Sequence, residues 1–143
     1  NAKINSFILP ENHFYTFKKQ LGANFKVFGY FNKNELVGFY TLILNNKYLE
    51  TYFLGYDSEY QYKHQLYLNM LYDMAQFGIN NQFKTIVYAR TAMEIKSSIG
   101  AKPKDMVMYL KHTNWFMNGI LKYIFRLMNP SKIWEERHPF KSN

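Results

Sequence analysis

Three apolar segments joined by two short polar turns constrain the fold of this chain more than any other feature. The sequence predicts strands at FKVFGYF (25–31), LVGFYTLIL (36–44) and YLETYFLGY (48–56), because all three are rich in aromatic and β-branched residues. The connections NKNE (32–35) and NNK (45–47) leave room only for turns. The three strands are therefore expected to form an antiparallel meander. Its middle strand is apolar on both faces, which is typical of the interior of a covered sheet.

Helical patterns lie on both sides of this meander in the sequence. Residues 10–22 predict a short helix with Pro10 near its start and Gly22 as its stop. Residues 58–81 predict the longest helix, which Asp57 or Ser58 can cap. Its apolar residues recur at helical spacing in two rows, and they predict a wide buried stripe: Tyr67, Leu71, Met74 and Leu66, Met70, Phe77.

Shorter elements follow the long helix. The pattern predicts a strand at 83–89 (FKTIVYA), a compact helix at 92–99 and a last strand at 105–112 (DMVMYLKH). The T-x-x-E spacing of Thr91 and Glu94 predicts a capping box, and Gly100 suits the left-handed position after the helix. The order predicts a mixed α/β (α+β) fold, an antiparallel meander followed by β-α-β-α-β, with helices on both faces.

An extra C-terminal helix is expected at 113–128, followed by an irregular tail to 143. Asn118, Lys122 and Arg126 form a narrow polar row on this helix, and nearly all its other residues are apolar. We expect the helix to be buried within the domain. Docking against a partner and contact with a membrane surface are the alternatives. The whole chain, 1–143, is expected to form one domain, and its start at Asn1-Ala2 without a Met is compatible with a fragment of a longer protein.

Composition excludes several kinds of site. The chain has no Cys, which rules out a thiol nucleophile and Cys-ligated metals, and its four His are too scattered for a metal motif. We expect no metal. Residues 90–143 carry ten basic and four acidic residues, but no RNA-binding signature accompanies this charge, so nucleic acid is not an expected partner. We expect a cytoplasmic protein, with a homodimer as an open alternative.

Arg90 and Glu94 raise the question of function. Capping explains Thr91, Glu94 and Gly100 almost completely. Arg90, however, lies where a strand leads into a helix, and ligands of open α/β sheets collect at that edge. Its guanidinium there is suited to holding a carboxylate, phosphate or carbonyl of a substrate.

The phrase ARTAMEIKSSIGAKP (89–103), after LGYDSEYQYKHQLYLNMLYDMA (54–75), resembles the GNAT-like acyltransferase domains of bacterial proteins, namely their BioF2-like and FemAB-like relatives. The resemblance covers about residues 25–112. It implies that the sheet splays between strands 48–56 and 83–89 to admit acyl-CoA or acetyl-CoA as co-substrate. An amine, such as a small-molecule acceptor, would then attack the thioester.

The resemblance also implies roles for particular residues. Backbone groups near Leu54, Gly55 and Tyr56 would pair with the pantetheine arm, and the next helix start, with Lys63 and His64, would face the pyrophosphate. Glu94 and His64 are the candidate acid–base residues. However, DSEYQYKH (57–64) lacks the family's glycine-rich phosphate loop and has two acids near its start. A non-catalytic binding or assembly module and a peripheral membrane-associated protein are therefore the alternative functions.

Overall fold

The meander is present in a computed structural model of the chain, which describes residues 9–89, 91–107, 109–128, 134–137 and 139–140. Strands β1 (Phe25–Asn32), β2 (Glu35–Asn45) and β3 (Tyr48–Tyr56) pair antiparallel in this order. Lys33 (φ 55°) and Asn46 (φ 52°) adopt left-handed backbone conformations in the two turns. The predicted strands agree with the observed ones to within a residue at each end.

A fourth strand makes the sheet mixed. Strand β4 (Thr85–Val87) runs parallel to β3, and the strand order is β1-β2-β3-β4. It is shorter than the predicted strand 83–89. The connection from β3 to β4 contains the long helical region, as parallel neighbours require. The predicted mixed α/β class is confirmed.

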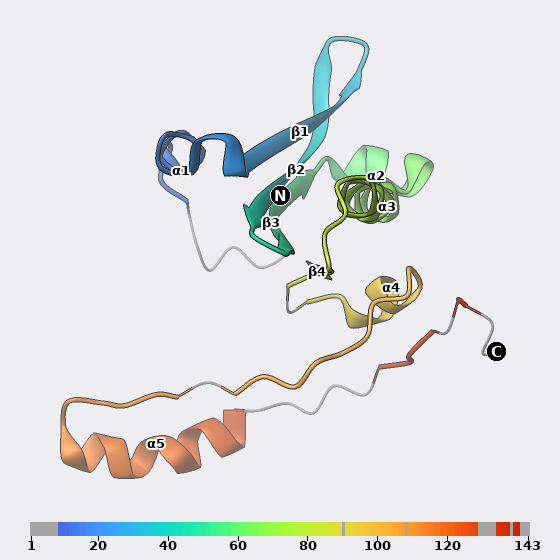
Figure 1. The fold of residues 1–143 in the computed structure, drawn as a ribbon. Helices are drawn as coiled ribbons and strands as arrows, with labels where there is room; N and C mark the ends of the chain where they lie inside the picture. The colour runs from blue at the N-terminus through green and yellow to red at the C-terminus, as the bar shows by residue number, and fades with distance from the viewer. Residues whose placement is uncertain (1–8, 90, 108, 129–133, 138, 141–143) are drawn as a thin grey trace.

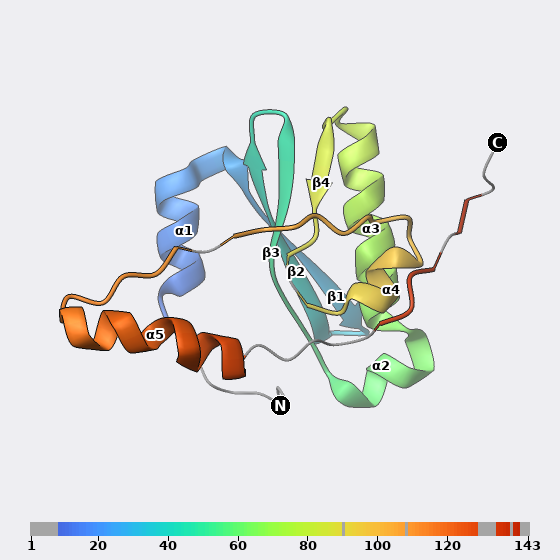
Figure 2. The same ribbon diagram turned by 90° about the horizontal axis from the view of Figure 1, so that it is seen from below.

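Helices cover both faces of the sheet (Figures 1 and 2). On one face, Phe14 of α1 (His13–Leu21) packs against Phe25, Phe39 and Phe53, with ring centroids 5.6–6.5 Å apart. A short 3-10 turn (Gly22–Asn24) joins α1 to β1.

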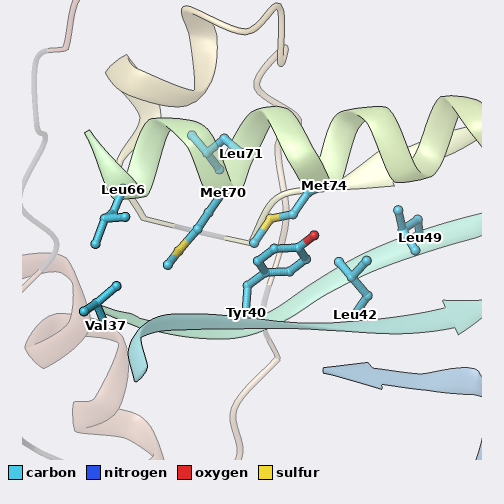
Figure 3. Packing of buried hydrophobic residues seen from close by; sticks show 8 residues of the cluster. All are labelled: Val37, Tyr40, Leu42, Leu49, Leu66, Met70, Leu71 and Met74. Carbon is cyan, nitrogen blue, oxygen red and sulfur yellow. The ribbon is translucent and has the colours of Figure 1, made fainter. Parts of the chain in front are cut away.

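The other face carries the main core (Figure 3). Met70 and Met74 of α3 (Leu66–Asn80) point toward β2, where Tyr40 and Leu42 are buried. The apolar rows predicted from helical spacing therefore do form the buried stripe.

The single helix predicted at 58–81 is wrong. The structure has two helices, α2 (Ser58–His64) and α3, separated by Gln65 in the left-handed conformation (φ 48°, ψ 44°). The Asn69 side chain donates to the His64 carbonyl at 2.8 Å and so satisfies the end of α2. The predicted cap is present, because the Asp57 carboxylate accepts a hydrogen bond from the Glu59 amide.

The capping box predicted for the next helix is also wrong. Helix α4 (Met93–Ser97) has Ala92 as its N-cap, in a left-handed conformation and without a side-chain cap. Gly100 does adopt the predicted left-handed conformation (φ 84°). The Glu94 carboxylate is directed to another partner, described below.

The predicted strand at 105–112 is not formed: residues 105–107 and 109–112 belong to no strand. The chain instead runs extended to α5 (Trp115–Met128), whose first amides are capped by the Asn114 side chain. No residue of α5 is buried, so the expected burial of this helix is wrong. Both views show α5 apart from the sheet (Figures 1 and 2).

Candidate functional site

The ladder between β3 and β4 stops well before β3 ends. Only three residues of β3 pair with β4, the last pair being Glu50 with Val87. One residue further, the Thr51 hydroxyl donates to the Val87 carbonyl at 3.0 Å. Beyond this point, Leu54, Gly55 and Tyr56 pair with β2, and the described strands give β3 no partner on its other edge. The β3–β4 ladder therefore ends where the resemblance predicts a splay.

A cavity of about 220 Å³ occupies this opening. Its walls come from β3, from α3 and from the segment that joins β4 to α4. The lining residues are Thr51, Tyr52, Phe53 and Leu54; Tyr67, Leu71 and Met74; and Ala89, Thr91 and Lys96. We call this cavity the cleft. Its walls combine apolar side chains with a few hydroxyls and one ammonium group, a composition common in ligand sites.

Lys96 is the buried cation of the cleft, with only 7% of its surface exposed. Its ammonium group donates to the carbonyls of Tyr88 (2.7 Å) and Ala89 (3.4 Å), where the chain leaves β4. Burial lowers the pKa of Lys96, because the charged form loses hydration. This side chain therefore fixes the turn between β4 and α4 and places a positive charge beside the opening.

Two tyrosines near the cleft are partly buried and have raised pKa values. Burial is the main cause, and the charge of the nearby Tyr56 the lesser one, of a rise in the pKa of Tyr67 to about 12. Its phenol therefore stays protonated at neutral pH. Burial also raises the pKa of Tyr88, whose hydroxyl donates to the Leu71 carbonyl at 3.0 Å. Tyr88 thereby ties β4 to α3, whereas Tyr67 faces the cleft.

Tyr52 connects the cleft with α1 on the opposite face of the sheet. Its hydroxyl lies 2.9 Å from Nε2 of His13, and its ring stacks on Phe17 with centroids 4.9 Å apart. The Tyr52 side chain therefore reaches the α1 face of the sheet, where it contacts the His13 imidazole.

The residues predicted to bind the donor are spread along β3 and α2. Leu54 lines the cleft. Gly55 and Tyr56 continue the same strand edge, paired with β2 on their other side. Lys63 and His64 lie in the last turn of α2, and His64 lines a second cavity, of about 280 Å³, between β1, β2 and the α2–α3 helices. The structure thus places Leu54 in the cleft, Gly55 and Tyr56 further along the same strand, and His64 in a different cavity.

Glu94 and Arg90 complete the predicted set. The Glu94 carboxylate forms an ion pair with Arg137, at 2.5 Å, and both side chains are about half exposed (49% and 55%). The Arg137 amide also donates to the Ser97 hydroxyl at 2.9 Å. Residues near the end of the chain therefore contact α4. Arg90 lies outside the described residues.

The sequence interpretation missed the contribution of Lys96, Tyr67 and Thr51 to the cleft. Lys96 belongs to the recognised phrase, but its burial follows from the short distance between α4 and the end of β4, which no local pattern encodes. Tyr67 was assigned to the apolar stripe, and its position one turn before Leu71 could have placed it at the same wall. Within the described ranges, no group of three or more His, Asp or Glu residues is placed to hold a metal ion.

Comparison with known proteins identifies the fold. No protein-family model and no curated protein matches the chain. Among solved structures, the chain is similar to an aminoglycoside acetyltransferase, meta-AAC0020, from an uncultured soil metagenomic sample. The TM-score is 0.52 for its trehalose complex and 0.51 for its sisomicin complex, with 19% and 20% identity. Each match covers 78% of this chain and 79% of the other. The chain therefore has the fold of an acetyltransferase.

Proposed function

We propose that the protein is an N-acyltransferase that moves an acyl group from acyl-CoA to an amine. The observation that carries this proposal is the end of the β3–β4 ladder at Glu50 and Val87, with the cleft beyond it. The acetyltransferase fold supports the same conclusion. The narrower assignment to the BioF2-like or FemAB-like relatives stays a prediction.

The donor would lie along β3. From Tyr52 to Tyr56, backbone amides and carbonyls on the open edge of β3 are suited to the two amides of a pantetheine arm, as a peptide pairs with a sheet edge. Leu54, Gly55 and Tyr56 are the predicted partners in this pairing. The apolar side chains of Leu71 and Met74 form the opposite wall and suit the acyl chain.

The reaction requires a neutral amine. Its nitrogen attacks the thioester carbonyl, the C–N bond forms and the C–S bond breaks, and the sulfur leaves as a thiolate that takes up the proton lost by the amine. Glu94 and His64 remain the predicted acid–base candidates. The neutral phenol of Tyr67 is suited to donate to the developing oxyanion or the thiolate.

The acceptor is proposed to be a small-molecule amine. The aminoglycoside acetyltransferase with a similar fold was solved with sisomicin, which supports testing amino sugars first. Arg90 is the predicted acceptor-binding residue. We propose a cytoplasmic location, where acyl-CoA is available.

The acidic start of α2 favours a second candidate function, a non-catalytic module with this fold. The Asp57 carboxylate already accepts from the Glu59 amide in the first turn of α2, where the pyrophosphate is predicted to bind. A negative group at that position opposes the binding of a second anion. Lys63 and His64, one helix turn or more away, offset this repulsion only in part.

Calorimetric titration with acetyl-CoA and longer acyl-CoAs distinguishes the two functions. The acyltransferase proposal predicts binding that Thr91→Trp abolishes, because the indole occupies the cleft. Thr113→Trp is the matched control, since Thr113 is exposed and remote from the cleft. Equal binding by both variants would place the donor elsewhere. Failure of the unmodified protein to bind any acyl-CoA would favour the non-catalytic module.

A further inference from the structure

Helix α5 presents an apolar surface that the rest of the described structure does not cover. None of its fourteen residues is buried, and Leu127 (89%), Met128 (69%) and Phe116 (56%) expose more than half of their surface. Extended chain precedes the helix and separates it from the sheet in both views (Figures 1 and 2). Contiguous exposed apolar surface of this kind marks an interaction site.

The helix is strongly amphipathic. Asn118, Lys122 and Arg126 follow one another at intervals of four residues and therefore form one polar row. The remaining circumference is apolar over a broad arc. Six residues represent this arc along the length of the helix: Phe116, Ile120, Tyr123, Ile124, Leu127 and Met128. Only Lys122 and Arg126 are charged, and both are cations.

The segment around α5 is basic as well. Between residues 102 and 128, five cationic side chains face a single acid, Asp105. The cations are Lys102, Lys104, Lys111, Lys122 and Arg126. A partner that complements this segment must therefore combine an apolar interior with a negative surface. An anionic lipid bilayer provides both.

The dimensions of α5 fit a helix that lies on a bilayer. Within the described part of the chain, no helix combines the length and the hydrophobicity needed to cross a membrane. A helix with a broad apolar face and cationic polar residues instead lies in the plane of the interface. Trp115 and Tyr123 have side chains that favour the headgroup region.

We propose that α5 docks the protein on anionic membranes. Its apolar face enters the boundary between headgroups and acyl chains, and Lys122 and Arg126 contact lipid phosphates. The helix lies apart from the sheet in both views (Figures 1 and 2). This inference does not depend on the acyltransferase proposal, because no acyl donor takes part in it.

Flotation with lipid vesicles tests the inference on the full chain. We expect binding to phosphatidylcholine vesicles that contain about 30% phosphatidylglycerol, and much weaker binding to phosphatidylcholine alone. The double variant Lys122→Glu/Arg126→Glu should bind the anionic vesicles at least about tenfold more weakly. Lys18→Glu/Lys19→Glu, which reverses two charges on α1, is the matched control and should bind like the unmodified protein.

A second variant separates membrane docking from self-association. Ile124→Glu places a carboxylate in the apolar face, so it should also abolish vesicle binding, while circular dichroism confirms that the protein is folded. Absence of flotation by the unmodified protein overturns the proposal. The same holds if sedimentation shows a dimer that Ile124→Glu converts to a monomer and neither protein binds vesicles, because a second copy then covers the face.

Discussion

Gly78 allows α3 to lie closer to β4 than a residue with a side chain would permit. A Cβ atom added at this buried position would be 2.5 Å from Cδ1 and 2.7 Å from Cγ1 of Ile86, and 3.2 Å from Cδ2 of Leu49. The first two distances are shorter than real contacts of a Cβ atom. The substitution Gly78→Ala therefore forces Ile86 or the helix to move.

Two opposing effects determine the size of the change in stability. Alanine in place of glycine in a helix interior stabilises by about 1 kcal/mol. Overpacking of a tight interface costs about 1–3 kcal/mol. Because Ile86 is contacted at two atoms, one of them near its backbone, we expect the overpacking cost to exceed the helix gain. The free energy of unfolding should fall by about 1 kcal/mol, within a range of about 0–2 kcal/mol.

A double-mutant cycle isolates the steric part. Ile86→Ala alone should destabilise by about 1–2 kcal/mol, toward the low end for such truncations because Ile86 is only partly buried. In the double variant, the methyl group at position 78 no longer clashes with the Ile86 side chain. It also fills part of the cavity that truncation of Ile86 leaves. The double variant should therefore be about 1 kcal/mol more stable than the sum of the two single effects predicts.

Urea unfolding of the four proteins measures this coupling. Gly119→Ala is the control, because a Cβ atom at this exposed helical position has no neighbour within 4 Å. It should not lower stability. The reasoning is refuted if Gly78→Ala is more stable than the unmodified protein, or if the two substitutions are additive within about 0.3 kcal/mol.

Three further predictions concern charge and protonation. Asp57→Ser keeps a capping hydroxyl but removes the negative charge, so acetyl-CoA should bind about two- to fivefold more tightly by calorimetry. Lys96→Met leaves the carbonyls of Tyr88 and Ala89 without their donor and should destabilise by about 1–3 kcal/mol in urea. Burial lowers the pKa of Lys96, so between its folded-state pKa and its usual value of 10.5 the unfolded chain binds a proton at Lys96 that the folded protein lacks. The free energy of unfolding of the unmodified protein should therefore rise as the pH increases toward 10.5. Lys96→Met has no such group at position 96 and should lack this contribution. Burial raises the pKa of Tyr40 to about 12. The stability that the protonated phenol contributes is therefore complete below about pH 10 and is lost as the pH rises toward 12. In thermal unfolding, Tyr40→Phe should show a smaller fall in stability over this alkaline range.

The sequence predicted elements whose causes are local. Alternating and aromatic residues bounded by two turns specified the three-stranded meander, and helical spacing identified Met70 and Met74 as core. The break at Gln65 was not predictable in the same way. Its left-handed conformation is accompanied by a hydrogen bond from the Asn69 side chain to the His64 carbonyl, a contact that helical periodicity does not encode.

Two predictions made from local patterns were wrong because tertiary contacts determine the structure at those positions. Residues 105–112 have the composition of a strand, but strands need a neighbouring edge, and no described strand lies beside them. Thr91 and Glu94 have capping-box spacing, yet Glu94 pairs with Arg137, forty-three residues away. The opening of the sheet was predicted from a family resemblance. The presence of Lys96 in the cleft depends on α4 packing close to the end of β4, which is a tertiary contact.

The contacts of Arg137 with α4, and of Phe140 with Gly100 just after it, have a practical consequence. Arg137 holds Glu94 and Ser97, and the Phe140 ring lies over Gly100, where an added Cβ would be 2.1 Å from it. These links immobilise the short helix whose Lys96 reaches the cleft. Shortened versions made for crystallisation or screening should therefore retain the polypeptide through Phe140. A deletion ending at α5 would release α4, and loss of ligand binding in such a protein would say nothing about its chemistry.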